Sequence, residues 1–274
     1  MQKVLPKLVL IFVLAQVIGL AVGANLISEI ASGEMEQPVI FSENPDDPLN
    51  ALFLIGGILF FTVLLLVFMT FFKGPGLFRF FEIFVVFTAS IIVFATFFPE
   101  TIAFVFAVEL IAIRLLLPKS VFVRNIAAVI SVAGVGALIG VSLGVIPVLV
   151  FLILLSVYDF IAVFKTKHMV TLAKGISGKN LAFTLAIPTE EHQFELGTGD
   201  LVLPLVFAVS VMKASTAPYP FYLVPAAMVL IASIIGLMFT INWVGNHIGK
   251  ALPALPPQAV LMILAWLASI ALGF

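Results

Sequence analysis

The chain contains no cysteine and little charge. Without cysteine it has no disulfides, thiolate metal sites or cysteine nucleophiles. Only 10% of its 274 residues are charged, whereas soluble domains carry about 25%. Because 63% of the residues are hydrophobic, there is too little polar surface to coat a water-soluble globule. A net charge of −1 offers no basic field for nucleic acid. The composition therefore predicts a polytopic protein of the lipid bilayer that binds no nucleic acid.

Apolar runs of the length needed to cross a bilayer, about 20 residues, recur along the chain. The first run lacks a small-x-small cleavage site, so we interpret it as a retained span rather than a signal peptide. We therefore expect an all-α fold with nine transmembrane helices. The predicted spans are 5–24, 49–72, 77–97, 100–118, 122–143, 146–164, 199–217, 220–243 and 254–273.

The basic residues set the predicted orientation. If the N-terminus is cytoplasmic, all of the 13 lysine and arginine residues except Lys213 fall on the cytoplasmic side. Positive charge near span ends marks that side, so we expect a cytoplasmic N-terminus and an extracytoplasmic C-terminus. Two connections are long, an acidic outer loop at 25–48 and an inner loop at about 165–198.

Two aspartates lie inside or beside apolar runs. Asp159 lies in the run 146–164, and Asp200 begins the next span. An acid at a helix centre costs about 2.5 to 3.5 kcal/mol, so such a residue usually faces the protein interior or a wet cavity and has a function. Asp159 is six residues, roughly 9 Å, from the cytoplasmic Lys165. Because the two spans run antiparallel, we expect both carboxyl groups at a similar depth.

Such a pair has a specific chemistry. Two carboxylates that share a site hold one proton between them. The charged member can take a proton from a water as the water attacks an amide carbonyl, while the protonated member polarises the carbonyl oxygen. The same pair also fits a proton- or cation-coupled secondary transporter, or a structural acid. A transporter predicts an inverted repeat, which the sequence lacks, so a protease is favoured. A prepilin-peptidase-like enzyme is a further alternative, with a different order of motifs.

Glycines precede the second acid, in Gly197-Thr198-Gly199-Asp200. Glycine permits backbone conformations and close approaches that other residues prevent. We expect a substrate backbone or span six to come near at this point.

A proline-rich segment, Pro253-Ala254-Leu255, precedes span nine on the same predicted face. Proline removes a backbone donor and resists helix. Irregular backbone at membrane depth is tolerated only against protein or a wet cavity. We therefore expect this segment to border the aspartates.

These motifs resemble the presenilin and signal-peptide-peptidase family of intramembrane aspartyl proteases. The family's signatures are Tyr-Asp in span six, Gly-x-Gly-Asp in span seven and Pro-Ala-Leu before span nine. Here they are Tyr158-Asp159, Gly197-Thr198-Gly199-Asp200 and Pro253-Ala254-Leu255. The resemblance implies that Asp159 and Asp200 are catalytic, that the remaining motif residues shape the active site and bind substrate, and that no cofactor is needed. It also implies substrates with a transmembrane helix or a signal peptide.

The resemblance extends to organisation. The N-in orientation resembles presenilin, but the inner loop lacks the long hydrophobic segment that presenilin cuts in its own maturation. We expect one uncut chain without obligatory partner subunits, in the cell membrane of a microbe, as in archaeal homologues. The chain is then a single membrane domain, 1–274, with five spans in 1–145 and the catalytic spans six to nine in 146–274.

Other polar residues receive structural interpretations. His168, His192 and His247 have no metal-ligand spacing, so no metal site is expected. Glu82, Glu109 and Arg114 are interpreted as structural, with Arg114 extending to the membrane surface.

The glycines of span five favour close helix packing. The segment 180–188 predicts a short strand ended by Pro188, whose edge is available for an unwound substrate segment to pair with.

Overall fold

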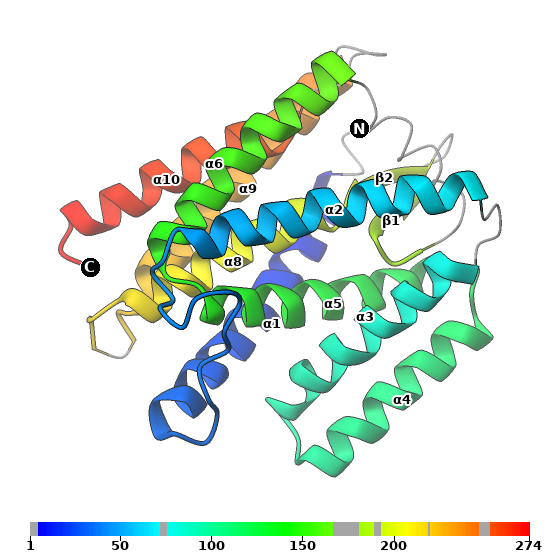
Figure 1. The fold of residues 1–274 in the computed structure, drawn as a ribbon, viewed down its shortest axis with the longest axis horizontal. Helices are drawn as coiled ribbons and strands as arrows, with labels where there is room; N and C mark the ends of the chain where they lie inside the picture. Colours follow the sequence, from blue (N-terminus) through cyan, green and yellow to red (C-terminus); the bar gives the residue numbers. More distant parts are fainter. Residues whose placement is uncertain (1–4, 72–75, 167–180, 189–192, 219, 247–252) are drawn as a thin grey trace.

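The computed structural model describes residues 5–71, 76–166, 181–188, 193–218, 220–246 and 253–274. Within these residues the chain is almost entirely helical (Figure 1). Each predicted span coincides with one helix, although the first helix continues past its predicted end at residue 24. The three histidines lie outside the described residues. The α-helices are α1 (Leu5–Ser32), α2 (Leu49–Phe71), α3 (Gly76–Ala95), α4 (Glu100–Leu116), α5 (Val121–Ser142), α6 (Val145–Ile161), α8 (Gly199–Ala214), α9 (Leu223–Asn246) and α10 (Leu255–Ala271).

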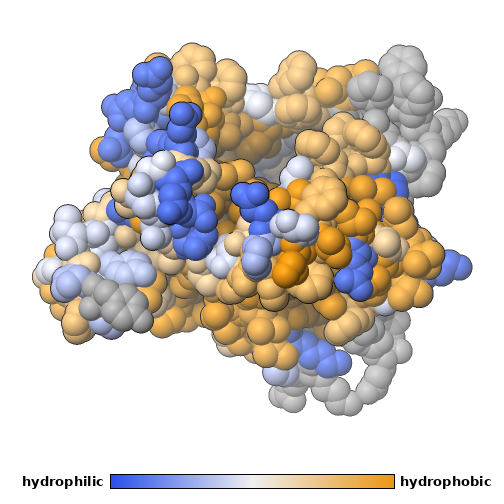
Figure 2. Space-filling model, turned by 90° about the horizontal axis from the view of Figure 1, so that it is seen from below, coloured by the Kyte–Doolittle hydropathy of each residue, from blue (hydrophilic) through white to orange (hydrophobic). Residues whose placement is uncertain are grey.

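The surface is hydrophobic over much of the face in Figure 2. Large side chains such as Phe60, Phe80 and Phe122 are 64%, 63% and 74% exposed. Five helices of the described residues are long and apolar enough to cross a membrane. An apolar surface of this extent is stable against lipid rather than water, as expected of an integral membrane protein.

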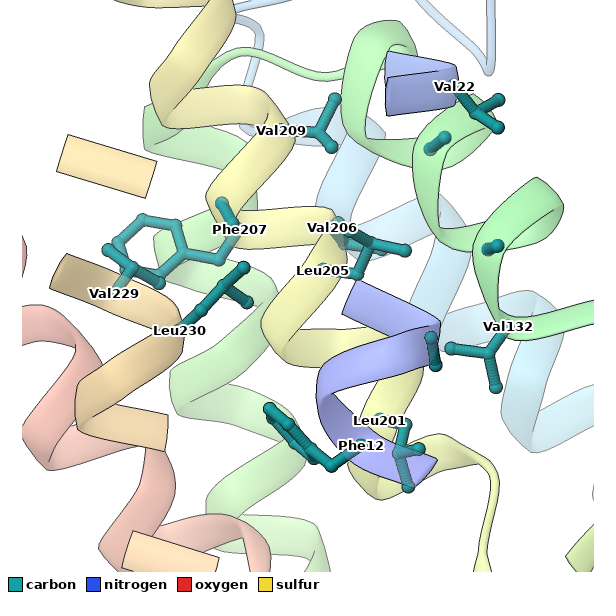
Figure 3. Close-up of a cluster of buried hydrophobic side chains, with 14 of the residues drawn as sticks. Phe12, Val22, Val132, Leu201, Leu205, Val206, Phe207, Val209, Val229 and Leu230 are labelled. Carbon is teal, nitrogen blue, oxygen red and sulfur yellow. The ribbon is translucent and has the colours of Figure 1, made fainter. Parts of the chain in front are cut away.

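The helix α8 lies at the centre of the packing, with α1 and α5 along one side and α9 on the other (Figure 3). Glycines let the backbones approach. A Cβ added at Gly136 would lie 2.7 Å from Leu205 Cδ2, and Gly19 faces the same leucine from α1. One turn along, a Cβ at Gly140 would lie 2.7 Å from Val209 Cβ. The predicted close packing of span five is confirmed.

The remaining helices form two groups around this centre (Figure 1). On one side α9 and α10 pack together, and α6 packs on α10 and α8. On the other side α3 packs between α4 and α5. The helix α2 lies along α6. This arrangement places the start of α8, the end of α6 and the start of α10 at one end of the molecule.

A β-hairpin precedes α8. Its strands β1 (Thr184–Pro188) and β2 (Gln193–Gly197) are antiparallel, with Leu185 opposite Leu196. The predicted strand at 180–188 is confirmed for β1, whereas β2 was not predicted. Because β2 ends at Gly197, the hairpin leads directly into the first turn of α8.

The interpretation of Arg114 as a side chain that extends to the membrane surface is wrong. Arg114 is fully buried, and its guanidinium forms an ion pair of 2.9 Å with Glu82 of α3, which is also fully buried. Its Nη1 donates to the carbonyl of Pro118 (2.9 Å). A buried charge needs such a partner, and the ion pair joins α3 to α4. The structural interpretation of both residues is confirmed.

Candidate active site

Asp159 lies near the end of α6, three residues before a short π-helical turn, η1 (Ala162–Thr166). The helix forms because its sequence is apolar throughout, apart from Ser156, Tyr158 and this acid. Asp159 is half-buried, and its Oδ2 accepts a hydrogen bond of 3.3 Å from the backbone N–H of Leu255. Since Leu255 is the first residue of α10, the end of one helix meets the start of another at this carboxyl group.

The prolines at the start of α10 explain this contact. The first N–H groups of a helix have no partner within it. Pro256 and Pro257 supply no N–H, so Leu255 provides the available donor of this turn. Pro253 and Leu255 are buried, and Ala254 is half-buried. The structure thus places Pro253-Ala254-Leu255 beside Asp159, as predicted.

Asp200 lies in the first turn of α8, directly after the hairpin. Thr198 fixes the junction, because both its backbone N–H (3.1 Å) and its Oγ1 (3.0 Å) donate to the carbonyl of Phe183. One residue beyond Asp200, the carbonyl of Leu201 accepts a bond of 2.9 Å from Nε2 of the buried Gln16 of α1. The turn that carries Asp200 is therefore held on two sides.

The glycines beside Asp200 face open space. A Cβ added at Gly199 would meet nothing within 4 Å, and one at Gly197 would meet only Asp200 Oδ2, at 3.8 Å. Span six does come near the start of α8, because α6 packs on α8, but no atom of it lies within 4 Å of a Cβ added at either glycine. The glycines leave room beside the carboxyl group instead.

The structure brings the two aspartates together. Their carboxyl groups are close enough to interact electrostatically. Tyr158, the residue before Asp159, is half-buried. Both carboxyl groups lie at helix N-termini, Asp200 within the first turn of α8 and Asp159 against the first N–H of α10. The positive end of the α8 dipole favours negative charge at Asp200. At Asp159 the N–H at the start of α10 acts in the same direction, against the negative end of α6 itself.

The expectation that the edge of β1 is available to a substrate is wrong. Asn125 of α5 exchanges two hydrogen bonds with Ala186: its Nδ2 donates to the Ala186 carbonyl (2.8 Å), and its Oδ1 accepts from the Ala186 N–H (2.9 Å). The other edge of β1 pairs with β2. The sequence interpretation overlooked Asn125 and used Arg124 only for the orientation, although two adjacent polar residues near the start of a largely apolar helix are a usable signal.

A cavity of about 570 Å³ lies elsewhere, around Lys213 at the far end of α8. Lys213 Nζ donates there to Gln37 Oε1 (3.0 Å) and to the Val141 carbonyl (2.6 Å). Thirteen residues of helix, roughly 20 Å, separate this lysine from Asp200. In the part of the chain that the structure describes, no group of acidic or histidine side chains is arranged to hold a metal ion.

Comparisons with known proteins identify similar sequences and folds. The family model described as signal-peptide peptidase, presenilin aspartyl protease matches residues 9–195, which include Asp159 but not Asp200. A presenilin family intramembrane aspartate protease solved in space group C222 is similar, with a TM-score of 0.72, 26% identity and coverage of 98% of this chain and 99% of that one. A structure of such a protease in space group P2 gives a TM-score of 0.68 and 28% identity, with coverage of 96% of each chain. The comparison with curated proteins found no match.

Proposed function

Since the chain belongs to the family of signal-peptide peptidase and presenilin aspartyl proteases, we propose that it hydrolyses peptide bonds in transmembrane segments with Asp159 and Asp200 as its catalytic residues. The observation that carries the proposal is the placement of these two carboxyl groups at the end of the bundle where α6 meets α8 and α10, within electrostatic range of each other. A paired-carboxylate protease needs this arrangement, because each acid alone supplies only half of the proton transfers.

The two carboxyl groups share one proton. The ionised member removes a proton from a water that attacks the substrate amide carbon, while the protonated member donates to the carbonyl oxygen. As the tetrahedral intermediate collapses and the C–N bond breaks, the carboxyl group that took the water proton gives it to the leaving nitrogen. The other carboxylate takes back a hydroxyl proton of the intermediate, so the pair again holds one proton. The Leu255 N–H supports this step by keeping Asp159 oriented.

The substrate backbone runs past Gly197 and Gly199, where the missing side chains leave open space beside Asp200. A transmembrane helix must unwind before its amides are exposed to attack. Because both edges of β1 are occupied, we assign any added substrate strand to β2, at its Gly197 end. Tyr158 and Pro253-Ala254-Leu255 border the same space from α6 and α10.

The wider organisation is proposed on the same basis. The helices correspond to nine spans with a cytoplasmic N-terminus and an extracytoplasmic C-terminus, in a single domain whose part 146–274 is catalytic. The substrates are proteins with a transmembrane helix or a signal peptide. The enzyme acts as one uncut chain without partner subunits in a microbial cell membrane. The alternative of a proton- or cation-coupled transporter has no support from the family match.

Purified protein in liposomes, incubated with a single-span substrate, tests the proposal. We expect product fragments from the unaltered chain, none from Asp159→Ala or Asp200→Ala, and inhibition by a transition-state mimic of aspartyl proteases. Proton flux without fragments would instead support the transporter.

A further inference from the structure

The outer edge of β1, the edge that faces away from β2, is filled by side chains of the neighbouring helix α5. Asn125 makes the two hydrogen bonds to Ala186 that a partner strand would make. Thr184, two residues before Ala186 in β1, is bonded to Arg124. The Nε of Arg124 donates to the Thr184 carbonyl (3.0 Å), and its Nη2 donates to the Thr184 hydroxyl. Backbone groups of alternate residues face the same edge of a strand, so these contacts continue one pattern.

The pattern extends by one more step to α3. The backbone N–H of Ala182 donates to Oε1 of the fully buried Glu82 (2.9 Å). Glu82 is held by Arg114 and by Arg79, each at 2.9 Å. Residues 182, 184 and 186 are therefore each bonded to a polar side chain of α3 or α5. We call Glu82, Arg124 and Asn125 the edge contacts.

The edge contacts connect to Asp200 through short links. Thr184 is paired with Gly197 across the hairpin. The carbonyl of Phe183 accepts both bonds from Thr198, two residues before Asp200. Arg124 also reaches β2 through a 3.1 Å ion pair with Glu195. A shift of β1 along α5 would therefore move the turn that carries Asp200.

We propose that the edge contacts are positioning residues for hydrolysis: with Asn125 as the central member, they fix the position of β1 against α3 and α5 and so set where Asp200 stands relative to Asp159 and the scissile bond. This inference rests on the proposed function. It assigns to the helices of the first half of the chain a role in selecting the bond that is cut. Asn125 touches neither substrate nor reacting atoms and acts through the hairpin.

The central test replaces Asn125 by Leu, which has a similar shape and no hydrogen-bonding groups. Asp, in Asn125→Asp, keeps the shape and the acceptor but loses the Nδ2 donor. A matched control is Ser131→Ala on the same helix, where a buried hydroxyl has no hydrogen-bond partner among the described residues. Each variant is assayed with a single-span substrate for kcat, KM, the distribution of cleavage sites by mass spectrometry, and Tm.

For Asn125→Leu we expect kcat to fall about 10- to 100-fold, the scale of a small misplacement of a reacting group. We expect KM to change less than about twofold and cleavage to spread to adjacent bonds. Asn125→Asp should show a smaller change of the same kind, and Ser131→Ala none. If Asn125→Leu does not fold, the Asp variant decides.

Wild-type kcat and a single cleavage site in the folded Asn125 variants would overturn the proposal. So would a loss of kcat that follows Tm while the cleavage site stays unchanged, because that marks a purely structural role. Asp159→Ala and Asp200→Ala are measured in the same assay. If they still cleave, the proposed function itself fails; if they are inactive while the Asn125 variants behave as wild type, only this inference fails.

Discussion

Asp200 lies on a helix that is buried on nearly all sides. Asp159 lies near the end of a helix whose residues just before and just after it are exposed. In α8 every residue from Pro204 to Met212 is buried. In α6 the buried residues end at Leu152, and Val157 and Phe160 are 52% and 53% exposed. The comparison indicates that the packing of α8 holds Asp200 in place, while the position of Asp159 depends on its contact with α10.

The largest effect on turnover should come from substitution of the carboxyl groups themselves, because α6 and α8 each supply one of the two. Asp159→Asn and Asp200→Asn each remove one of two proton-transfer groups, so turnover should fall about 10²- to 10⁴-fold. Stability should not fall, since a neutral amide replaces an acid that is costly to bury. Turnover and Tm measured on the same preparations check this. A loss confined to one of the two variants would break the equivalence.

The packing difference predicts unequal costs for truncation. Leu205→Ala empties the space that α1 and α5 form around α8 and should lower the free energy of unfolding by about 2 to 5 kcal/mol. Val157→Ala, at the exposed end of α6, should change it by less than about 0.5 kcal/mol. Denaturation in detergent micelles measures both. Equal costs would show that the two helices are packed alike.

The contact between α10 and Asp159 predicts an effect on turnover. Leu255→Pro removes the N–H that bonds to Asp159, and a hydrogen bond to a charged group is worth about 1.5 to 3 kcal/mol, so kcat should fall about 10- to 100-fold. Leu255→Ala keeps the N–H and serves as the control for the lost side chain. If the two variants turn over equally, the N–H does not orient Asp159.

The smallest change in stability should come from substitution of the glycines that let α5 pack closely against α8. A Cβ at Gly140 would lie 2.9 Å from the Val206 carbonyl oxygen, so Gly140→Ala should destabilise by about 1 to 2 kcal/mol despite its better helix propensity. Gly57→Ala in α2, where an added Cβ meets nothing within 4 Å, should be neutral or stabilising by up to about 1 kcal/mol. Thermal unfolding of the two variants compares them, and a stable Gly140→Ala would contradict the tight packing.

The helices and the three motifs could be predicted from the sequence because their signals are local. Apolar length marks a span, and an acid such as Asp159 inside a span is conspicuous. The strand β2 was missed because five residues that include Glu195 are too short and too polar for a clear alternation.

Contacts between segments far apart in the chain could not be predicted from the sequence. Arg114 is buried because it pairs with Glu82, which lies on another helix. Spacing within one helix does not reveal such a partner. The same holds for Asn125 and Ala186, 61 residues apart. Both contacts are made where helices meet the inner loop, so they depend on packing that local patterns do not encode.

The most direct test of the central claim is cleavage of a single-span substrate in oxygen-18-labelled water by the unaltered chain, Asp159→Asn, Asp200→Asn and the double variant. If the two carboxyl groups activate one water as a unit, the new C-terminal carboxylate carries one labelled oxygen, and the double variant is no slower than either single variant. Label-free product, or unimpaired cleavage by either single variant, would contradict the claim.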